Sequence, residues 1–175
     1  MRYSVAQRAR RVKLLVFDVD GVLSDGQMIV GDDGVQVKSF DVRDGFALVW
    51  ARRCGLRTAI ITAERSATVT HRAKRLGIEW VAQFARDKAK AFKECCGHFG
   101  VPTDQICYVG DDLPDLPVLR RVGLAVAVPD APSEVKAHAH YITKKAGGRG
   151  AAREVVELIL RAQGRWEAVV REYLT

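Results

Sequence analysis

The 175-residue chain is 48% hydrophobic and carries a net charge of +7, which is typical of a globular protein with one sizeable core. No apolar run approaches the roughly 20 residues of a membrane span, and the basic N-terminal stretch with Arg8, Arg10 and Arg11 lacks the apolar segment of a secretory signal. We therefore expect a cytoplasmic protein with four reduced cysteine thiols. The basic residues are spread out with little aromatic interleaving, which favours an anionic small-molecule partner over nucleic acid or a membrane.

Apolar strands alternate with amphipathic helices, which predicts an α/β fold with a Rossmann-like, doubly wound parallel sheet. The expected strands are Lys13–Phe17, Thr58–Ile61, Trp80–Gln83, Ile106–Val109 and Leu124–Val128. The expected helices are about Asp44–Cys54, Ser66–Leu76, Asp87–His98 and Leu116–Val122, with a terminal pair near Ala152–Tyr173. No linker or repeat divides the chain, so residues 1–175 are expected to form a single domain.

One stretch, at about residues 26–40, interrupts this alternation. Met28–Val30 and Val35–Phe40 flank the tetrapeptide Gly31–Gly34, in which an Asp-Gly pair indicates a tight turn. We therefore expect a β-hairpin that protrudes beside the first strand, with apolar side chains that no intrachain sheet covers.

Two carboxylates, Asp18 and Asp20, directly follow the first expected strand. Alternate residues of a strand point to the same side, so both acids would project together from its carboxyl end, while Gly21 lets the chain turn away. Open α/β sheets place their functional sites at this edge. The pair is suited to phosphoryl transfer, with one acid as nucleophile and the other as proton carrier.

Three further signals follow later strands. The hydroxyl of Thr62 can hold a phosphoryl oxygen, and Lys88 can offset negative charge, although each residue alone is also typical of a helix cap or a solvated surface. Gly110–Asp115 places three acids together, and such acids repel one another unless a cation or other partners offset them. Hard oxygen ligands suit Mg²⁺, so Asp111 is the expected metal ligand, while Asp115 can also cap a helix.

These motifs follow one another along the chain in the order D-x-D-G, Thr, Lys and G-D-D-x-x-D. This order resembles that of the haloacid dehalogenase superfamily of phosphatases. The resemblance implies that Asp18 forms an aspartyl-phosphate and that Asp20 protonates the leaving alkoxide and then deprotonates water. It also implies that Thr62 and Lys88 are catalytic, that Asp20 and Lys88 contact the substrate, and that the Asp18 carboxylate, the Asp20 carbonyl and Asp111 bind Mg²⁺.

The intervals from Asp18 to Thr62 and from Thr62 to Lys88 leave no room for a large cap domain. A capless site is open, so it accepts large substrates or is closed by a neighbouring subunit.

Within the superfamily, the chain resembles phosphatases of 3-deoxy-D-manno-octulosonate 8-phosphate, which serve the pathway to the eight-carbon sugar of lipopolysaccharide. The segments that carry this resemblance are Asp18–Gly26, the hairpin, Phe40–Gly45 and Gly147–Glu154. It implies a homotetramer associated through the hairpins, in which the glycine-rich segment Gly147–Gly150 reaches a neighbour's active site. It further implies that the substrate is contacted by Arg43, Asp44, Gly45 and Arg72. Taken alone, the first three residues would be interpreted as a helix start and Arg72 as part of a solvated helix face.

Glu64 departs from the Arg that is usual after the Thr in these enzymes. An Arg there can hold a substrate carboxylate bidentately. A Glu at this position resembles instead the phosphatases of the nine-carbon 2-keto-3-deoxynononate 9-phosphate, and Arg75 could be the basic partner of Glu64. The eight-carbon ester is our first expectation and the nine-carbon ester the alternative. A nucleic-acid end phosphatase and a non-catalytic tetramerisation module are less favoured, the latter because Asp18, Asp20, Lys88 and Asp111 are all present.

Overall fold

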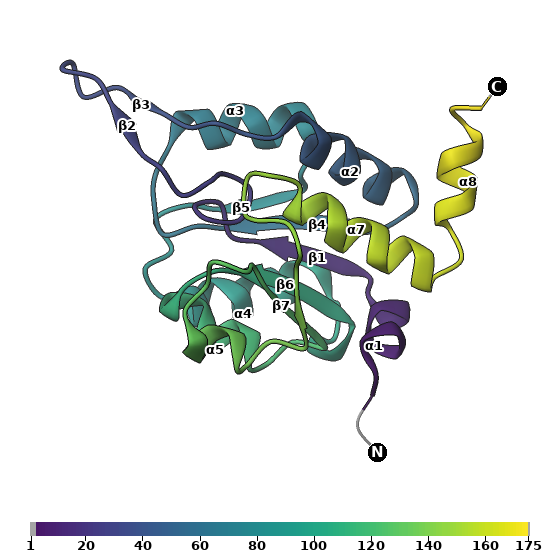
Figure 1. Cartoon of the computed structure of the whole chain (residues 1–175). Helices are drawn as coiled ribbons and strands as arrows, with labels where there is room; N and C mark the ends of the chain where they lie inside the picture. Colours follow the sequence, from purple (N-terminus) through teal and green to yellow (C-terminus); the bar gives the residue numbers. More distant parts are fainter. Residues whose placement is uncertain (1–2, 175) are drawn as a thin grey trace.

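The computed structural model describes residues 3–174, whose centre is a six-stranded parallel sheet in the order β5-β4-β1-β6-β7-β8 (Figure 1). Its strands are β1 (Leu14–Phe17), β4 (Arg57–Ile61), β5 (Trp80–Ala82), β6 (Ile106–Gly110), β7 (Leu124–Ala127) and β8 (Tyr141–Ile142). All four residues of β1 are buried, because β1 lies between β4 and β6 with helices over both faces. The predicted fold class is confirmed.

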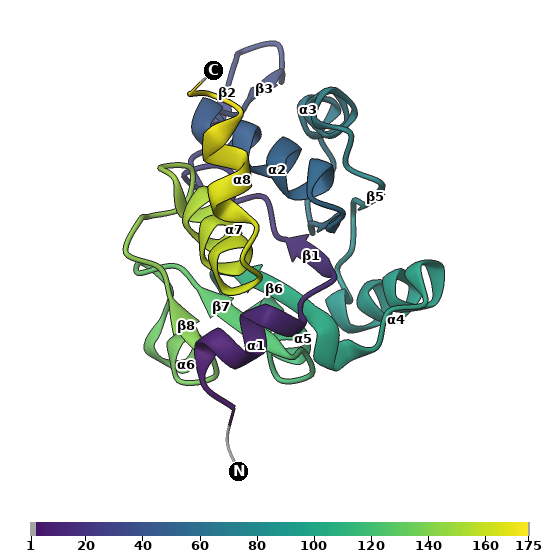
Figure 2. The same ribbon diagram turned by 90° about the vertical axis from the view of Figure 1, so that its right-hand side faces the viewer.

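Helices cover both faces of the sheet. The longer ones are α2 (Val42–Arg53), α3 (Ala67–Leu76), α4 (Lys88–Phe99) and α7 (Ala151–Ala162), and the shorter ones are α1 (Val5–Arg11), α5 (Leu116–Leu119), α6 (Ser133–Lys136) and α8 (Trp166–Arg171). In Figures 1 and 2, α2, α3 and α7 lie on one side of β1, and α4 and α5 lie on the other. In the described part of the chain, no helix is both long and apolar enough to cross a membrane.

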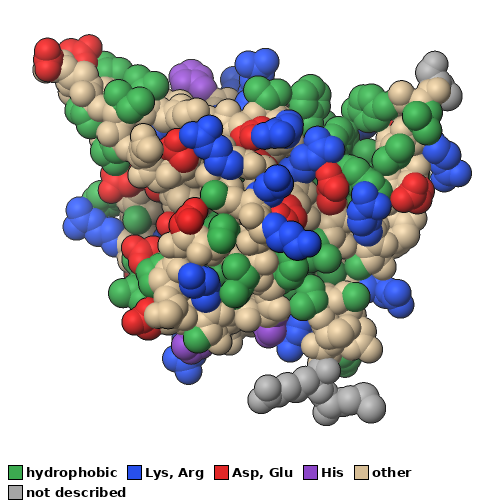
Figure 3. All heavy atoms as spheres, in the orientation of Figure 1, with side chains coloured by type: hydrophobic (Ala, Val, Ile, Leu, Met, Phe, Trp, Pro, Cys, Tyr) green, Lys and Arg blue, Asp and Glu red, His purple; other side chains and the backbone are tan. Residues whose placement is uncertain are grey.

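The predicted hairpin is present and projects from the body of the protein (Figure 1). Its strands β2 (Ile29–Val30) and β3 (Gln36–Val37) pair antiparallel over only two residues each, so the ladder is shorter than predicted. Hydrophobic side chains lie along this ribbon in Figure 3, and Ile29 and Val37 are 60% and 53% exposed. We call residues 26–37 the ribbon below.

The five long predicted strands lie within about a residue of their predicted bounds, but several helices differ. The helix α2 begins at Val42, two residues early, because the Asp41 side chain accepts a hydrogen bond from the Arg43 N–H and caps it. The helix predicted over Leu116–Val122 ends at Leu119. The elements α1, α6 and β8 were missed, since two to seven residues give little periodic signal.

Between β1 and β4 the chain forms only the ribbon and α2, and between β4 and α4 it forms only α3 and β5. The carboxyl edge of the sheet is therefore not covered by an inserted domain within the described residues. One continuous set of buried apolar residues fills the space between the sheet and both helix layers.

Candidate active site

The predicted site residues follow three neighbouring strands at one edge of the sheet. Asp18 follows β1, Thr62 follows β4 and Asp111 follows β6, and β1 pairs in parallel with both other strands. The carboxyl ends of parallel strands meet at the same edge. The topology thus brings together residues that are far apart in the sequence.

The carboxylates of Asp18, Asp111 and Asp115 form the centre of this site, with oxygen atoms that all lie within 4.8 Å of one another. The ammonium group of Lys88, at the start of α4, donates hydrogen bonds to Asp18 Oδ2 at 2.5 Å and to Asp115 Oδ1 at 2.6 Å. Lys88 is only 4% exposed, and lysine is almost never buried without a partner. We call these four residues the acidic centre.

Burial and mutual repulsion set the charge state of the acidic centre. Burial raises the pKa of Asp18 to about 6, with the charge of Asp115 acting in the same direction and Lys88 opposing it. Burial also raises the pKa of Asp111 to about 7, and the charges of Asp18 and Asp115 add to the effect. Burial would lower the pKa of Lys88, but the two neighbouring carboxylates outweigh it and raise that pKa. Three carboxylates therefore share one ammonium group.

This donor set fits a divalent cation, because hard carboxylate oxygens and uncompensated negative charge are what Mg²⁺ requires. The approach of Asp111 to the chain after β1 depends on Gly21, which has a φ of +79°. A Cβ atom there would lie 2.1 Å from Asp111 Oδ2. The residues that would hold the cation are Asp18 and Asp111, with Asp115 beside them.

Asp115 has a larger role than the helix cap that the sequence suggests. It is fully buried, and its carboxylate accepts hydrogen bonds from the Tyr108 hydroxyl at 2.5 Å and from the Asp111 N–H at 2.9 Å. Tyr108 was missed by the sequence analysis because, in the middle of a buried strand, it is indistinguishable from an ordinary core residue. Asp115 thus joins the floor of the site to the loop that carries Asp111.

Asp20 is held outside the acidic centre by a residue that the sequence analysis also missed. The Lys38 ammonium group, which follows β3, forms an ion pair with Asp20 Oδ1. The Ser24 hydroxyl lies 3.3 Å from the same oxygen. The two acids of the D-x-D pair therefore have separate lysine partners.

Thr62 is buried at the end of β4, and its hydroxyl has no hydrogen-bond partner within residues 3–174, which leaves it available to a ligand. Glu64 lies on the loop after β4 with an exposed side chain, and its carbonyl accepts a hydrogen bond from the Phe84 N–H. The catalytic role of Thr62 and the substrate contact of Glu64 stay predictions, and both residues lie where these roles would need them.

The four residues predicted to contact substrate around the start of α2 divide into two groups. The Arg72 guanidinium donates to the Asp41 carbonyl at 3.1 Å and lies directly against Gly45. Arg43 is exposed and pairs with Asp41. Asp44, in contrast, is buried, and its carboxylate accepts hydrogen bonds from two backbone N–H groups at the start of α7. Its observed contacts make it the cap of α7.

Gly147 and Gly148 of the glycine-rich segment have close contacts within their own chain, and the reach of this segment to a neighbouring subunit stays a prediction. The Gly148 N–H donates to the Val22 carbonyl at 2.9 Å, and a Cβ atom on Gly147 would lie 1.8 Å from the Gly21 carbonyl oxygen. Both glycines therefore lie against the loop after β1 of their own chain. The close approach of two backbones, which only glycine allows, explains their presence.

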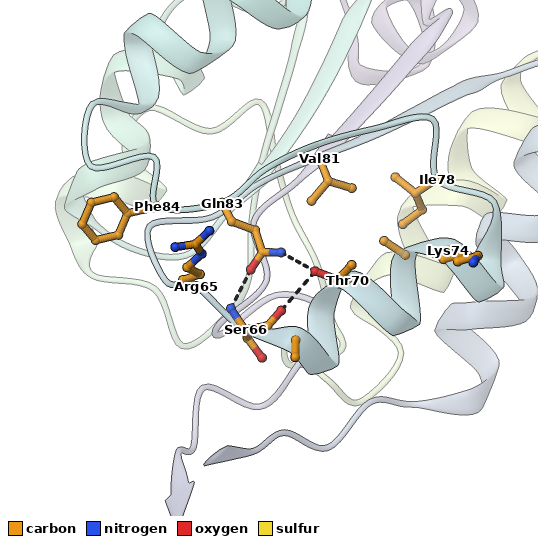
Figure 4. A pocket seen from close by; sticks show the side chains of 10 residues that line it. Arg65, Ser66, Thr70, Lys74, Ile78, Val81, Gln83 and Phe84 are labelled. Atoms are coloured by element: carbon orange, nitrogen blue, oxygen red, sulfur yellow. Dashed lines mark hydrogen bonds between the residues drawn. The ribbon is translucent and has the colours of Figure 1, made fainter. Parts of the chain in front are cut away.

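A large surface groove lies away from these residues (Figure 4). It is an open groove of about 970 Å³ between α3 and β5, where Gln83 accepts a hydrogen bond from the Ser66 N–H and donates one to the Thr70 hydroxyl. None of the predicted catalytic or metal-binding residues lines this groove. The acidic centre is therefore identified by its buried charged groups and its place at the end of the strands, and not by this groove.

Comparisons with known proteins agree with this geometry. Residues 67–155 match the family model of haloacid dehalogenase-like hydrolases. The 3-deoxy-D-manno-octulosonate 8-phosphate phosphatase KdsC of Yersinia pestis is 44% identical over 93% of this chain and 87% of its own length.

Two solved structures are also similar over nearly their whole length. A probable YrbI family phosphatase from Pseudomonas syringae is 47% identical with a TM-score of 0.96, and covers 98% of this chain and 97% of its own. The 3-deoxy-D-manno-octulosonate 8-phosphate phosphatase of Moraxella catarrhalis, solved with magnesium, phosphate and KDO, is 42% identical with a TM-score of 0.95 and 97% coverage of both chains. The chain belongs to the 3-deoxy-D-manno-octulosonate 8-phosphate phosphatase family of haloacid dehalogenase-like hydrolases.

Proposed function

We propose that this protein is a Mg²⁺-dependent phosphatase that releases the terminal phosphate of 3-deoxy-D-manno-octulosonate 8-phosphate. The observation that carries the proposal is the acidic centre, where a buried carboxylate on the central strand end faces Lys88 and Asp111. The family membership and the printed substrate of the relatives supply the sugar acid.

In the first step, a carboxylate oxygen of Asp18 attacks phosphorus and forms a new P–O bond. The bond between phosphorus and the sugar oxygen breaks, and Asp20 gives its proton to that oxygen. In the second step, Asp20 takes a proton from water, which attacks the aspartyl-phosphate and releases phosphate with Asp18 restored. Lys88 orients Asp18 throughout through their 2.5 Å hydrogen bond. A bound Mg²⁺, held by Asp18, the Asp20 carbonyl and Asp111, would neutralise charge on the transferred group.

A panel of phosphate esters tests this function directly. The purified protein with Mg²⁺ is assayed for phosphate release from the eight-carbon ester, the nine-carbon ester, a simple sugar phosphate and a 5′-phosphorylated oligonucleotide. The highest kcat/KM is expected for the eight-carbon ester. Turnover of the oligonucleotide alone would contradict the proposal, and no turnover of any ester would favour the non-catalytic tetramerisation module.

The nine-carbon ester is the second candidate, because Glu64 is exposed on the loop after β4 and can accept hydrogen bonds from the hydroxyls of a longer substrate. In that case Glu64→Arg should shift the kcat/KM ratio toward the eight-carbon ester. One gained charge-assisted contact is worth about 1.5–3 kcal/mol, or roughly ten-fold and upward in that ratio. Glu94→Arg, at an exposed acid of α4, is the matched charge-reversal control. An unchanged ratio in Glu64→Arg would show that Glu64 does not contact the substrate.

We further propose that the protein works in the cytoplasm as a homotetramer. Its four cysteines are all free, which fits a reducing compartment. The exposed apolar ribbon is a surface that is unfavourable in water unless another subunit covers it.

A further inference from the structure

The ion pair between Lys38 and Asp20 is the strongest feature of the site that the phosphatase mechanism above does not use. The side chain of Lys38 is 1% exposed, whereas that of Asp20 is 29% exposed. Every residue from Gly26 to Arg43 is described by the structure, and Lys38 is the only buried one. This segment thus carries a single buried residue, and the partner of that residue is the expected proton carrier.

The two oxygens of Asp20 have different environments. Both donors, the Lys38 ammonium group and the Ser24 hydroxyl, contact Oδ1. Within residues 3–174, no group donates a hydrogen bond to Oδ2. Ser24 is itself fully buried, and its hydroxyl lies 3.3 Å from both Asp20 Oδ1 and the Val19 carbonyl oxygen, so its single proton can go to either acceptor and the Lys38 ammonium group is the main donor to Oδ1. One oxygen is thus held, and the other is available for proton transfer.

We propose that Lys38 is a positioning residue for Asp20, which fixes Oδ1 so that Oδ2 carries the proton to the leaving oxygen. When the bond between phosphorus and the sugar oxygen breaks, the proton moves from Oδ2 to that oxygen. In the second step the same Oδ2 receives a proton from the attacking water. The inference rests on the proposed phosphatase function, and Lys38 touches neither phosphorus nor the leaving group in this scheme.

The leaving group separates this role from a merely structural one. A sugar alkoxide needs a proton as it leaves, whereas the nitrophenolate of p-nitrophenyl phosphate leaves without one. Loss of Asp20 positioning should therefore slow the sugar ester and spare the aryl ester. General damage to the fold or to phosphate binding should slow both esters equally.

The test compares Lys38→Met and wild type on the eight-carbon ester and on p-nitrophenyl phosphate, with Mg²⁺. We expect kcat for the sugar ester to fall on the order of 10²-fold, within the usual range for proton-transfer groups, and kcat for the aryl ester to fall less than about three-fold. Asp20→Asn should show the same selectivity. The double variant with Lys38→Met and Asp20→Asn should hydrolyse the sugar ester no more slowly than Asp20→Asn alone, because the two residues act as one unit.

The controls keep the outcomes distinct. Lys93→Met, at an exposed lysine of α4, should leave both rates unchanged. Thermal unfolding shows whether Lys38→Met is folded. If it is not, Lys38→Gln becomes the test variant, and because it keeps a neutral donor, a smaller loss that is still confined to the sugar ester is expected. An equal loss for both esters would overturn the role of Lys38. A wild-type protein that hydrolyses neither ester would instead overturn the proposed function.

Discussion

The acidic centre and the ribbon both place side chains in unfavourable surroundings, but in opposite ways: charged groups are buried in the first and apolar groups are exposed in the second. The acidic centre keeps three mutually repelling carboxylates inside the protein, where one lysine offsets part of their charge. The ribbon keeps apolar side chains outside, on a two-residue ladder that cannot cover them. In our proposal the first arrangement serves chemistry within one chain, whereas the second is covered by another subunit. Lys38 lies where the two regions meet.

Substitution of the nucleophile should give the largest effect and should separate activity from stability. Asp18→Asn removes the attacking carboxylate, so we expect phosphate release to fall by about 10⁴-fold or more. It also removes one of three crowded carboxylates while Asp115 still pairs with Lys88, so the unfolding temperature without Mg²⁺ should not fall. Steady-state assays and calorimetry measure the two quantities. Near-native turnover of the purified variant would contradict the covalent mechanism.

The difference between the two regions also explains what the sequence could predict. Asp18, Thr62 and Asp111 follow strands with clear apolar patterns, and the parallel topology then places them together. Lys38 and Tyr108 could not be found in this way. Lys38 follows an exposed segment, so the local pattern predicts a solvated side chain. Tyr108 lies within a buried strand, and the pattern gives no sign of its polar partner Asp115.

The same limit applies to Asp44 and to the glycine-rich segment. Their partners are the start of α7 and the loop after β1, and these contacts depend on how distant elements pack. The family resemblance assigned roles to both, but the packing decides whether a residue contacts substrate, supports a helix or lies against another backbone.

Mg²⁺ and pH should act together on the stability of the acidic centre. The pKa values of Asp18 and Asp111 are raised to about 6 and about 7, so the folded protein binds more protons than the unfolded chain between their ordinary range and pH 7. Their contribution to stability is present at low pH and is lost as pH rises through 6 to 7. Mg²⁺ requires the ionised carboxylates, so it should stabilise more at high pH.

Differential scanning calorimetry with EDTA and with Mg²⁺, at about pH 5 and about pH 8, measures this linkage. We expect the rise in unfolding temperature on adding Mg²⁺ to be several degrees larger at the higher pH. Asp111→Asn is the control, because it removes one ligand and one titrating group. An equal rise at both pH values would show that the cation does not bind these carboxylates.

Ribbon variants should have the smallest effect on the folded chain and a clear effect on assembly. Ile29 and Val37 lie opposite each other and are largely exposed, so Ile29→Ser with Val37→Ser should change the free energy of unfolding of a single chain by no more than about 0.5 kcal/mol. If these side chains are covered by a neighbouring subunit, the same variant should dissociate the tetramer. Light scattering at micromolar concentration measures the mass, and Asp32→Ser at the ribbon tip is the control.

A monomeric wild-type protein would contradict the proposed tetramer, and with it any closure of the site by a neighbour. A tetramer that survives the double substitution would place the interface on another surface and leave the ribbon as a support for Lys38 alone.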